Sequence, residues 1–144
     1  MRRRWVCGAL VAIAALVSSG AAVGSGTTFY YFRMPSNNIY CAYMKGGGFP
    51  TELRCDTRTP IRPLPPKPKS CQFDWGAGYW MGPRGAAHVN CVSDSVYKNG
   101  SRVLRYGTSW HRGAFTCFSK RIGLRCVNAS HHGFFLSKQH SYRF

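Results

Sequence analysis

The acidic residues are the first side chains of this sequence whose placement could support catalysis. There are only four of them, and three follow a cysteine by one to three positions, in "CD", "CQFD" and "CVSD". Disulfides could gather these carboxylates into a cation site or into a pair suited to glycoside hydrolysis. The favoured alternative is that each aspartate caps a turn through its own backbone or forms an ion pair with Arg54 or Arg58. The four acidic residues are Glu52, Asp56, Asp74 and Asp94.

Five histidines offer metal ligands or acid–base groups, but none stands in a familiar catalytic pattern. The sequence has no G-x-S-x-G nucleophile elbow and no H-E-x-x-H zinc motif. The pair "HH" before a glycine could hold a metal only weakly. We therefore expect no catalytic residue, no metal and no cofactor. The histidines are His88, His111, His131, His132 and His140.

The stretch "DWGAGYWMGPRG" places aromatic rings among glycines. Rings in a glycine-rich loop can stack on sugar rings or bases, or they can pack in the core. We expect Trp75 in the core, because a large ring beside a disulfide is usually buried. Both alternatives stay open for the other rings, and the candidate binding residues of this loop are Tyr79, Trp80 and Arg84. Basic residues that would extend such a surface are Lys98, Arg102, Arg105, Arg112, Lys120 and Arg121.

The segment 1–24 has the layout of a secretory signal peptide. Three arginines precede an apolar run from Trp5 to Val17, and small residues follow. That run is shorter than the roughly 20 residues that a transmembrane helix needs, although an uncleaved anchor is the alternative. No second long apolar run follows, so we expect residues 25–144 to be secreted or held in the cell envelope, without a transmembrane span. Cys7 lies in the segment that cleavage would remove.

Six further cysteines indicate a disulfide framework, since an even number in an exported chain is typical of one. In "FTCFSKRIGLRCVN" a short turn places Cys117 and Cys126 on facing strands, where Cβ atoms lie ~4.5–5.5 Å apart. A zinc site would use CxxC pairs, and the sequence has none. We expect pairing in sequence order: Cys41–Cys55, Cys71–Cys91 and Cys117–Cys126.

The charge balance is strongly basic. The sequence has 20 Lys and Arg against four Asp and Glu, a formal net charge of +16. Without the three arginines of the leader, the remaining chain carries +13, spread along its whole length. Such a surface attracts polyanions, which outside a cell include wall polymers and anionic lipid headgroups. The alternative is that the charge provides solubility and serves no specific partner.

The pattern of the chain after the leader is β throughout. Short runs of aromatic and β-branched residues are separated by Gly, Pro, Asn and Ser, and no stretch keeps a helical apolar period. The sequence predicts one all-β domain over 25–144, a small disulfide-stapled antiparallel sandwich or partly open barrel. A proline-rich connector, residues 61–70, lies within it. The expected strands are 27–33, 38–44, 51–56, 87–93, 101–107, 113–119, 123–128 and 133–138.

Several phrases in order resemble a small exported actinobacterial family, the domain of unknown function 6636. They include "FRMPSNNIYCAY", "LRCD", "PPKPKSCQFDWG", "FTCFSKRIGLRCVN" and "HHGFFLS". The resemblance covers nearly all of residues 29–144 and implies an exported, disulfide-bearing, mostly β domain with no established activity. In "HHGF" His131 replaces the glycine that the family commonly has, which disfavours a tight turn there. His132 occupies the "HGF" position and is the best single histidine candidate, either for metal or acid–base work or as a hydrogen-bonding residue that pins the last hairpin.

These observations favour a non-catalytic module that binds an anionic cell-envelope polymer through Lys and Arg contacts and aromatic stacking. Its candidate binding residues are Tyr79, Trp80, Arg84 and His132. The alternative is an exported protein–protein interaction or inhibitor domain with a protein partner. A hydrolase that uses His132 and one aspartate is the least favoured hypothesis, and nucleic acid is not indicated as a partner.

Overall fold

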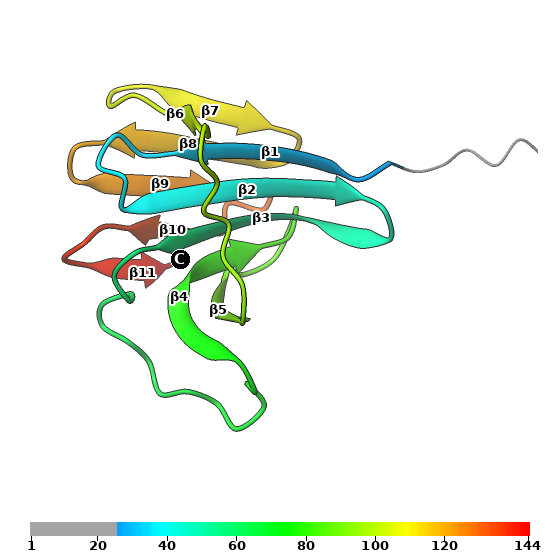
Figure 1. Ribbon diagram of the computed structural model, residues 1–144, viewed down its shortest axis with the longest axis vertical. Coiled ribbons are helices and arrows are strands. Elements are labelled where there is room, and N and C mark those ends of the chain that lie inside the picture. Colours follow the sequence, from blue (N-terminus) through cyan, green and yellow to red (C-terminus); the bar gives the residue numbers. More distant parts are fainter. Residues whose placement is uncertain (1–25) are drawn as a thin grey trace, which may run out of the picture.

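The computed structural model describes residues 26–144, which form two β-sheets packed face to face (Figure 1). The expected signal peptide, residues 1–24, lies outside the described residues. The first sheet, sheet A, has the strand order β5-β4-β3-β2-β1-β6, and the second, sheet B, has the order β11-β10-β9-β8-β7. The strands are β1 (Thr28–Arg33), β2 (Ile39–Gly46), β3 (Phe49–Thr57), β4 (Asp74–Met81), β5 (His88–Val92), β6 (Arg102–Val103), β7 (Ser109–Arg112), β8 (Phe115–Lys120), β9 (Gly123–Val127), β10 (Gly133–Leu136) and β11 (Ser141–Arg143).

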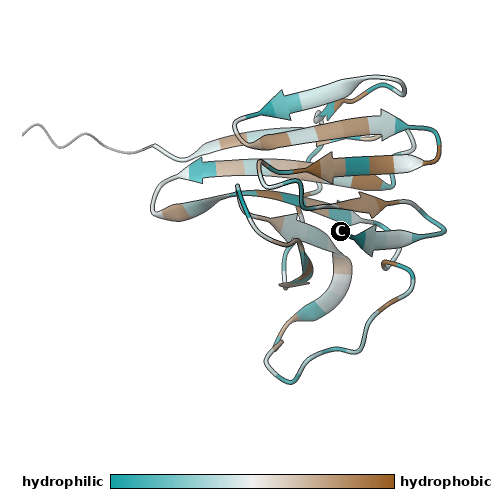
Figure 2. Ribbon diagram, turned by 180° about the vertical axis from the view of Figure 1, so that it is seen from behind, coloured by the Kyte–Doolittle hydropathy of each residue, from teal (hydrophilic) through white to brown (hydrophobic). Residues whose placement is uncertain are grey.

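The all-β prediction is confirmed, and the architecture is a sandwich whose sheets do not close into a barrel. Neighbouring strands are antiparallel, except that β6 pairs in parallel with β1. Seen from behind, the strands show the alternation of apolar and polar residues (Figure 2) that one buried and one solvent-facing surface require. Across residues 26–144, no helix is long and apolar enough to cross a membrane.

The core lies between the sheets and contains one disulfide on the inner face of each. Cys41–Cys55 joins β2 to β3, and Cys117–Cys126 joins β8 to β9. In both pairs the cysteines are directly opposite in register, and their Cα atoms lie 4.1 and 4.0 Å apart, so the sequence-order pairing agrees with the structure. The third disulfide, Cys71–Cys91, ties the residues before β4 to β5. Large rings fill the space around the inner cysteines, among them Phe32, Phe115 and Phe134.

The stretch that we expected to be a glycine-rich aromatic loop is a strand, β4. Its register against β5 shifts between Trp75 and Tyr79, which is the signature of a bulge. Gly76 has a φ of 88°, which glycine adopts without steric cost. A Cβ on Gly78 would lie 2.0 Å from the carbonyl oxygen of Cys55, so only glycine allows β3 and β4 to approach here. The glycines therefore permit a bent, tightly packed strand.

The proline-rich connector, residues 61–70, links β3 to β4 and touches both sheets. The amide of Ile61 donates to the carbonyl of Gly76 at 3.0 Å, and the carbonyl of Arg62 accepts from the amide of Ser141 at 2.6 Å. The indole of Trp75 donates to the carbonyl of Pro65 at 2.8 Å. Trp75 packs against the core but is only half-buried, so it lies at the edge of the core in which the sequence placed it.

Residues 93–101 cross the outer face of sheet A from one edge strand, β5, to the other, β6 (Figure 1). A buried ion pair fastens this crossover. The carboxylate of Asp56 accepts two hydrogen bonds from Arg54, and one each from the amide of Val96 and the side chain of Asn90. Arg54 also contacts the carboxylate of Asp94 at 2.8 Å. For these two aspartates the ion-pair interpretation is confirmed.

The turn before β10 forms in spite of its missing glycine. The amide of Asn128 donates to the carbonyl of His132 at 2.9 Å, and the amide of His131 donates to the carbonyl of Asn128 at 3.1 Å. His131 adopts a φ of 65° at this position. The expectation that the histidine would disfavour a tight turn is therefore wrong, because the surrounding hydrogen bonds hold a non-glycine residue in the left-handed region.

We expect His131→Gly to raise the free energy of unfolding by about 0.5 kcal/mol, the difference between two opposing effects. The left-handed conformation costs a non-glycine residue about 1–2 kcal/mol, and glycine removes that cost. Glycine also increases the conformational entropy of the unfolded chain, and this cancels part of the stabilisation. Urea unfolding under oxidising conditions measures the change. His111→Gly in β7 is the control, and it should lose stability because strand glycines are unfavourable. Equal losses of unfolding free energy in the two variants would contradict the claim that the left-handed conformation of His131 costs stability.

Candidate functional site

The outer face of sheet B carries one row of large side chains that runs across four strands. Phe118 lies opposite Arg125, Arg125 lies opposite Phe135, and Phe135 lies opposite Tyr142 in the strand register. Because side chains alternate along a strand, this row lies on the opposite side from the inner cysteines Cys117 and Cys126. We call these four residues, Phe118, Arg125, Phe135 and Tyr142, the aromatic platform.

One ring stack within the aromatic platform and one contact of its arginine with Phe144 order the platform. The rings of Phe135 and Tyr142 stack with their centroids 5.3 Å apart. The guanidinium of Arg125 lies 4.3 Å from the centre of the Phe144 ring, within cation–π distance. Phe118 and Tyr142 are still 41% and 44% exposed, so their faces are available to a ligand. A hollow of about 310 Å³ lies on the platform, with Lys120 and Ile122 at its rim.

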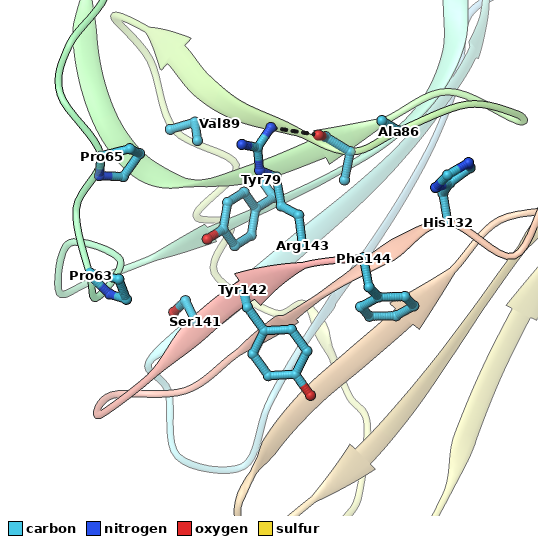
Figure 3. A pocket seen from close by; sticks show the side chains of 11 residues that line it. Pro63, Pro65, Tyr79, Ala86, Val89, His132, Ser141, Tyr142, Arg143 and Phe144 are labelled. Carbon is cyan, nitrogen blue, oxygen red and sulfur yellow. Dashed lines mark hydrogen bonds between the residues drawn. The ribbon is translucent and has the colours of Figure 1, made fainter.

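A second hollow, the end groove, adjoins the platform at Tyr142, which lines both (Figure 3). Its volume is about 450 Å³, and it lies between β11, the connector and the β4–β5 hairpin. Arg143 is held there by a 3.0 Å hydrogen bond to the carbonyl of Ala87. The remaining lining is mostly apolar and aromatic: Pro63, Pro65, Tyr79, Ala86, Val89, His132, Ser141 and Phe144.

The four binding residues predicted from the sequence do not form one surface. Tyr79 and His132 both line the end groove. The ring of Tyr79 is only 3% exposed, and burial raises the pKa of its hydroxyl, so that group stays protonated at neutral pH. Trp80 lies on the outer face of sheet A, where it stacks on His88 at 4.6 Å. Arg84 is exposed in the loop after β4. A binding role for these four residues stays a prediction.

The end groove brings His132 near Tyr79 and Ser141, but none of the four acidic residues lines it. Asp56 and Asp94 are paired with Arg54 on the far side of sheet A. Among residues 26–144, no three His, Cys, Asp or Glu side chains gather as a metal site would require. Within residues 26–144, the end groove therefore brings no carboxylate to His132.

The other basic residues singled out in the sequence are distributed over both sheets. Several of them lie over aromatic rings, as Lys98 does over Tyr31 at 4.4 Å and Arg121 does over Tyr106 at 5.4 Å. Arg102 and Arg105 line a separate hollow of about 480 Å³. The positive charge is thus close to every large surface hollow described above.

The sequence interpretation did not single out Phe118, Arg125, Phe135 or Tyr142. A signal was present in "FTCFSK" and "GLRCV", because the residues that alternate with the cysteines must face outward once the cysteines face inward. The pairing of four strands, and not any local motif, then aligns the outward residues in one row.

These features define a class: a small, basic, disulfide-stapled β-sandwich with an exposed aromatic face. The chain belongs to the Family of unknown function (DUF6636), whose family model matches residues 9–144. Family membership, which the resemblance implied, is therefore confirmed. Comparison with curated proteins and with solved structures gave no match.

Proposed function

We propose that this protein is a non-catalytic binding module that holds an anionic polymer of the cell envelope on the aromatic platform. The observation that carries the proposal is the row Phe118–Arg125–Phe135–Tyr142. In it the cation Arg125 lies between the exposed Phe118 and the half-buried Phe135 in the strand register. Flat aromatic faces favour stacking on the rings of a polymer. The guanidinium and the nearby ammonium of Lys120 are suited to its anionic groups.

The charge of the whole surface supports the same class of ligand. Outside the three arginines of the leader, 17 Lys and Arg remain against four Asp and Glu. Two of those acids, Asp56 and Asp94, form ion pairs with the same arginine, Arg54. A positive electrostatic field over the surface raises the local concentration of polyanions. Many weak contacts along one polymer can then act together.

A location outside the cytoplasm is part of the proposal. The three disulfides are consistent with an extracellular protein, because such bonds persist in oxidising compartments. The basic leader of residues 2–4 and the apolar run that follows it support export. An exported basic protein meets wall polymers and anionic surfaces first.

Cosedimentation of the oxidised protein with purified bacterial cell wall tests the proposal. We expect the protein to pellet at low salt and to be released when salt is raised, because the screening length falls from about 10 Å at 0.1 M to about 3 Å at 1 M. We also expect release when teichoic acid is stripped from the wall. Absence from the pellet at low salt, or retention after both treatments, would contradict binding to an anionic polymer.

A protein partner is the second candidate, and the apolar part of the platform favours it. Ile122 is 72% exposed and lines the same hollow as Phe118. Exposed apolar patches often mark protein interfaces. This alternative predicts a complex of defined stoichiometry that moderate salt does not release. Absence from the wall pellet at low salt, together with such a complex, would favour a protein partner over an anionic polymer.

A further inference from the structure

A further basic hollow, of about 430 Å³, lies on the outer face of sheet A, on the other side of the sandwich from the aromatic platform. Three cations converge on it: Arg33 at the end of β1, Arg58 just after β3, and Lys98 in the crossover. We call these three residues the cationic pocket. Neutral polar groups complete the lining: Ser36, Asn37, Tyr40, Asn99 and Gly100.

The guanidinium of Arg58 is fixed before any ligand arrives. It lies against a pair of tyrosine rings that pack edge to face, 5.2 Å from the centre of Tyr40 and 5.0 Å from that of Tyr97. Its Nε donates to the carbonyl of Asn37 at 2.9 Å, and one terminal nitrogen donates to the hydroxyl of Tyr40 at 3.3 Å. Only two of its five N–H groups are used in this way, so the remaining donors are available to an anion.

Arg33 and Lys98 are held in a similar way. Arg33 lies directly opposite Tyr40 on the neighbouring strand and donates to the side-chain oxygen of Asn37. The ammonium of Lys98 lies 4.4 Å from the centre of the Tyr31 ring. Each of these partners holds a cation in place without neutralising its charge.

Across residues 26–144, no carboxylate lies within ion-pair distance of the three cations. Asp56, which lies opposite Tyr40 on β3, directs its oxygens to Arg54, Asn90 and the amide of Val96. Three positive charges therefore meet in one hollow without a counter-charge from the described protein. An anion that binds in the hollow would relieve the mutual repulsion of these charges.

We propose that the cationic pocket binds a phosphate group, either a monoester or a diester. Two arginine forks and an ammonium match the several oxygens of a phosphate better than the two oxygens of a carboxylate. Neutral groups of the lining can donate further hydrogen bonds to the phosphate oxygens. They are the hydroxyls of Tyr40 and Ser36 and the side-chain amides of Asn37 and Asn99. This site is independent of the platform, and it holds whether or not the platform binds a polymer.

Titration of the oxidised protein with inorganic phosphate, monitored by NMR at constant ionic strength, tests the proposal. Chloride, titrated in parallel, is the control anion. We expect saturable shifts of the Arg33 and Arg58 side-chain signals. The double variant Arg33→Gln/Arg58→Gln should bind phosphate at least about 10-fold more weakly, since charge-assisted hydrogen bonds are lost. The control Lys67→Gln/Lys69→Gln removes the same charge from the exposed connector and should change affinity less than about 2-fold.

Two further probes distinguish the sources of the phosphate. A soluble glycerol-phosphate oligomer that binds more tightly than inorganic phosphate identifies a polymer diester. Vesicles of phosphatidylglycerol that compete with inorganic phosphate, where the oligomer does not, identify a lipid headgroup. Two results would overturn the proposal: chloride causes the same chemical-shift changes as phosphate, or the two double variants lose phosphate affinity equally. In either case binding would follow net charge alone. Thermal unfolding of both variants verifies that each remains folded.

Discussion

Asp56→Ala is expected to lower the free energy of unfolding by about 3–5 kcal/mol, because breaking a buried ion pair is strongly destabilising and leaves the buried guanidinium of Arg54 with only the exposed carboxylate of Asp94 as a charged partner. The side chains of Arg54 and Asp56 are only 7% and 1% exposed. Removing the carboxylate also takes away the acceptor of the Val96 amide, which fastens the crossover to sheet A. Urea unfolding of the oxidised protein measures the loss.

Two other aspartates provide the controls. Asp94 contacts the same arginine, but its side chain is 76% exposed. Asp94→Ala should therefore cost about 1 kcal/mol or less, as is usual for an exposed ion pair. Asp74 lies on the surface at the start of β4. Asp74→Ala should change stability by about 0.5 kcal/mol or less, as most surface substitutions do. Similar losses in all three variants would contradict the assignment of Asp56 as the anchor of the crossover.

The parts of the fold that depend on neighbours in sequence were predictable. The hairpin around Cys117 and Cys126 has a short turn, so its register and its disulfide follow from counting residues on either side. The same local logic applies to Cys41 and Cys55. These two hairpins identify an all-β, disulfide-stapled chain, but they do not say which strands of different hairpins come together.

The strand β4 was not predictable from local pattern, because its glycines are typical of a loop. Gly78 is required by the approach of the Cys55 carbonyl, a contact between residues far apart in the chain. The burial of Tyr79 follows from that pairing, since the strand directs its ring toward Phe134 of the other sheet. Local sequence therefore could not decide between a stacking ring and a core ring.

The candidate site depends on the same long-range pairing. Arg125 and Phe135 come from neighbouring strands, but Tyr142 belongs to a short edge strand that no sequence pattern marked. In the cationic pocket, Arg58 and Lys98 meet only because the crossover passes over sheet A. Composition predicted only that a ligand would be anionic, whereas the position of each candidate surface required the tertiary structure.

The largest functional effect is expected for the aromatic platform itself. Phe118→Ala/Tyr142→Ala removes two exposed rings of the row while it leaves all charges in place. Each stacked ring contributes about 1–3 kcal/mol in comparable sites, so the double variant should bind an anionic wall polymer at least about 10-fold more weakly. Phe49→Ala/Phe73→Ala removes two rings that are 65% and 55% exposed elsewhere, and it should bind normally.

The most direct test of the account is an equilibrium titration of soluble teichoic acid into the oxidised protein and these two double variants, with thermal unfolding to verify that each is folded. A loss of affinity that is confined to Phe118→Ala/Tyr142→Ala is the predicted result. Unchanged affinity in that variant, or equal losses in both, would contradict the claim that the aromatic platform is the polymer-binding surface.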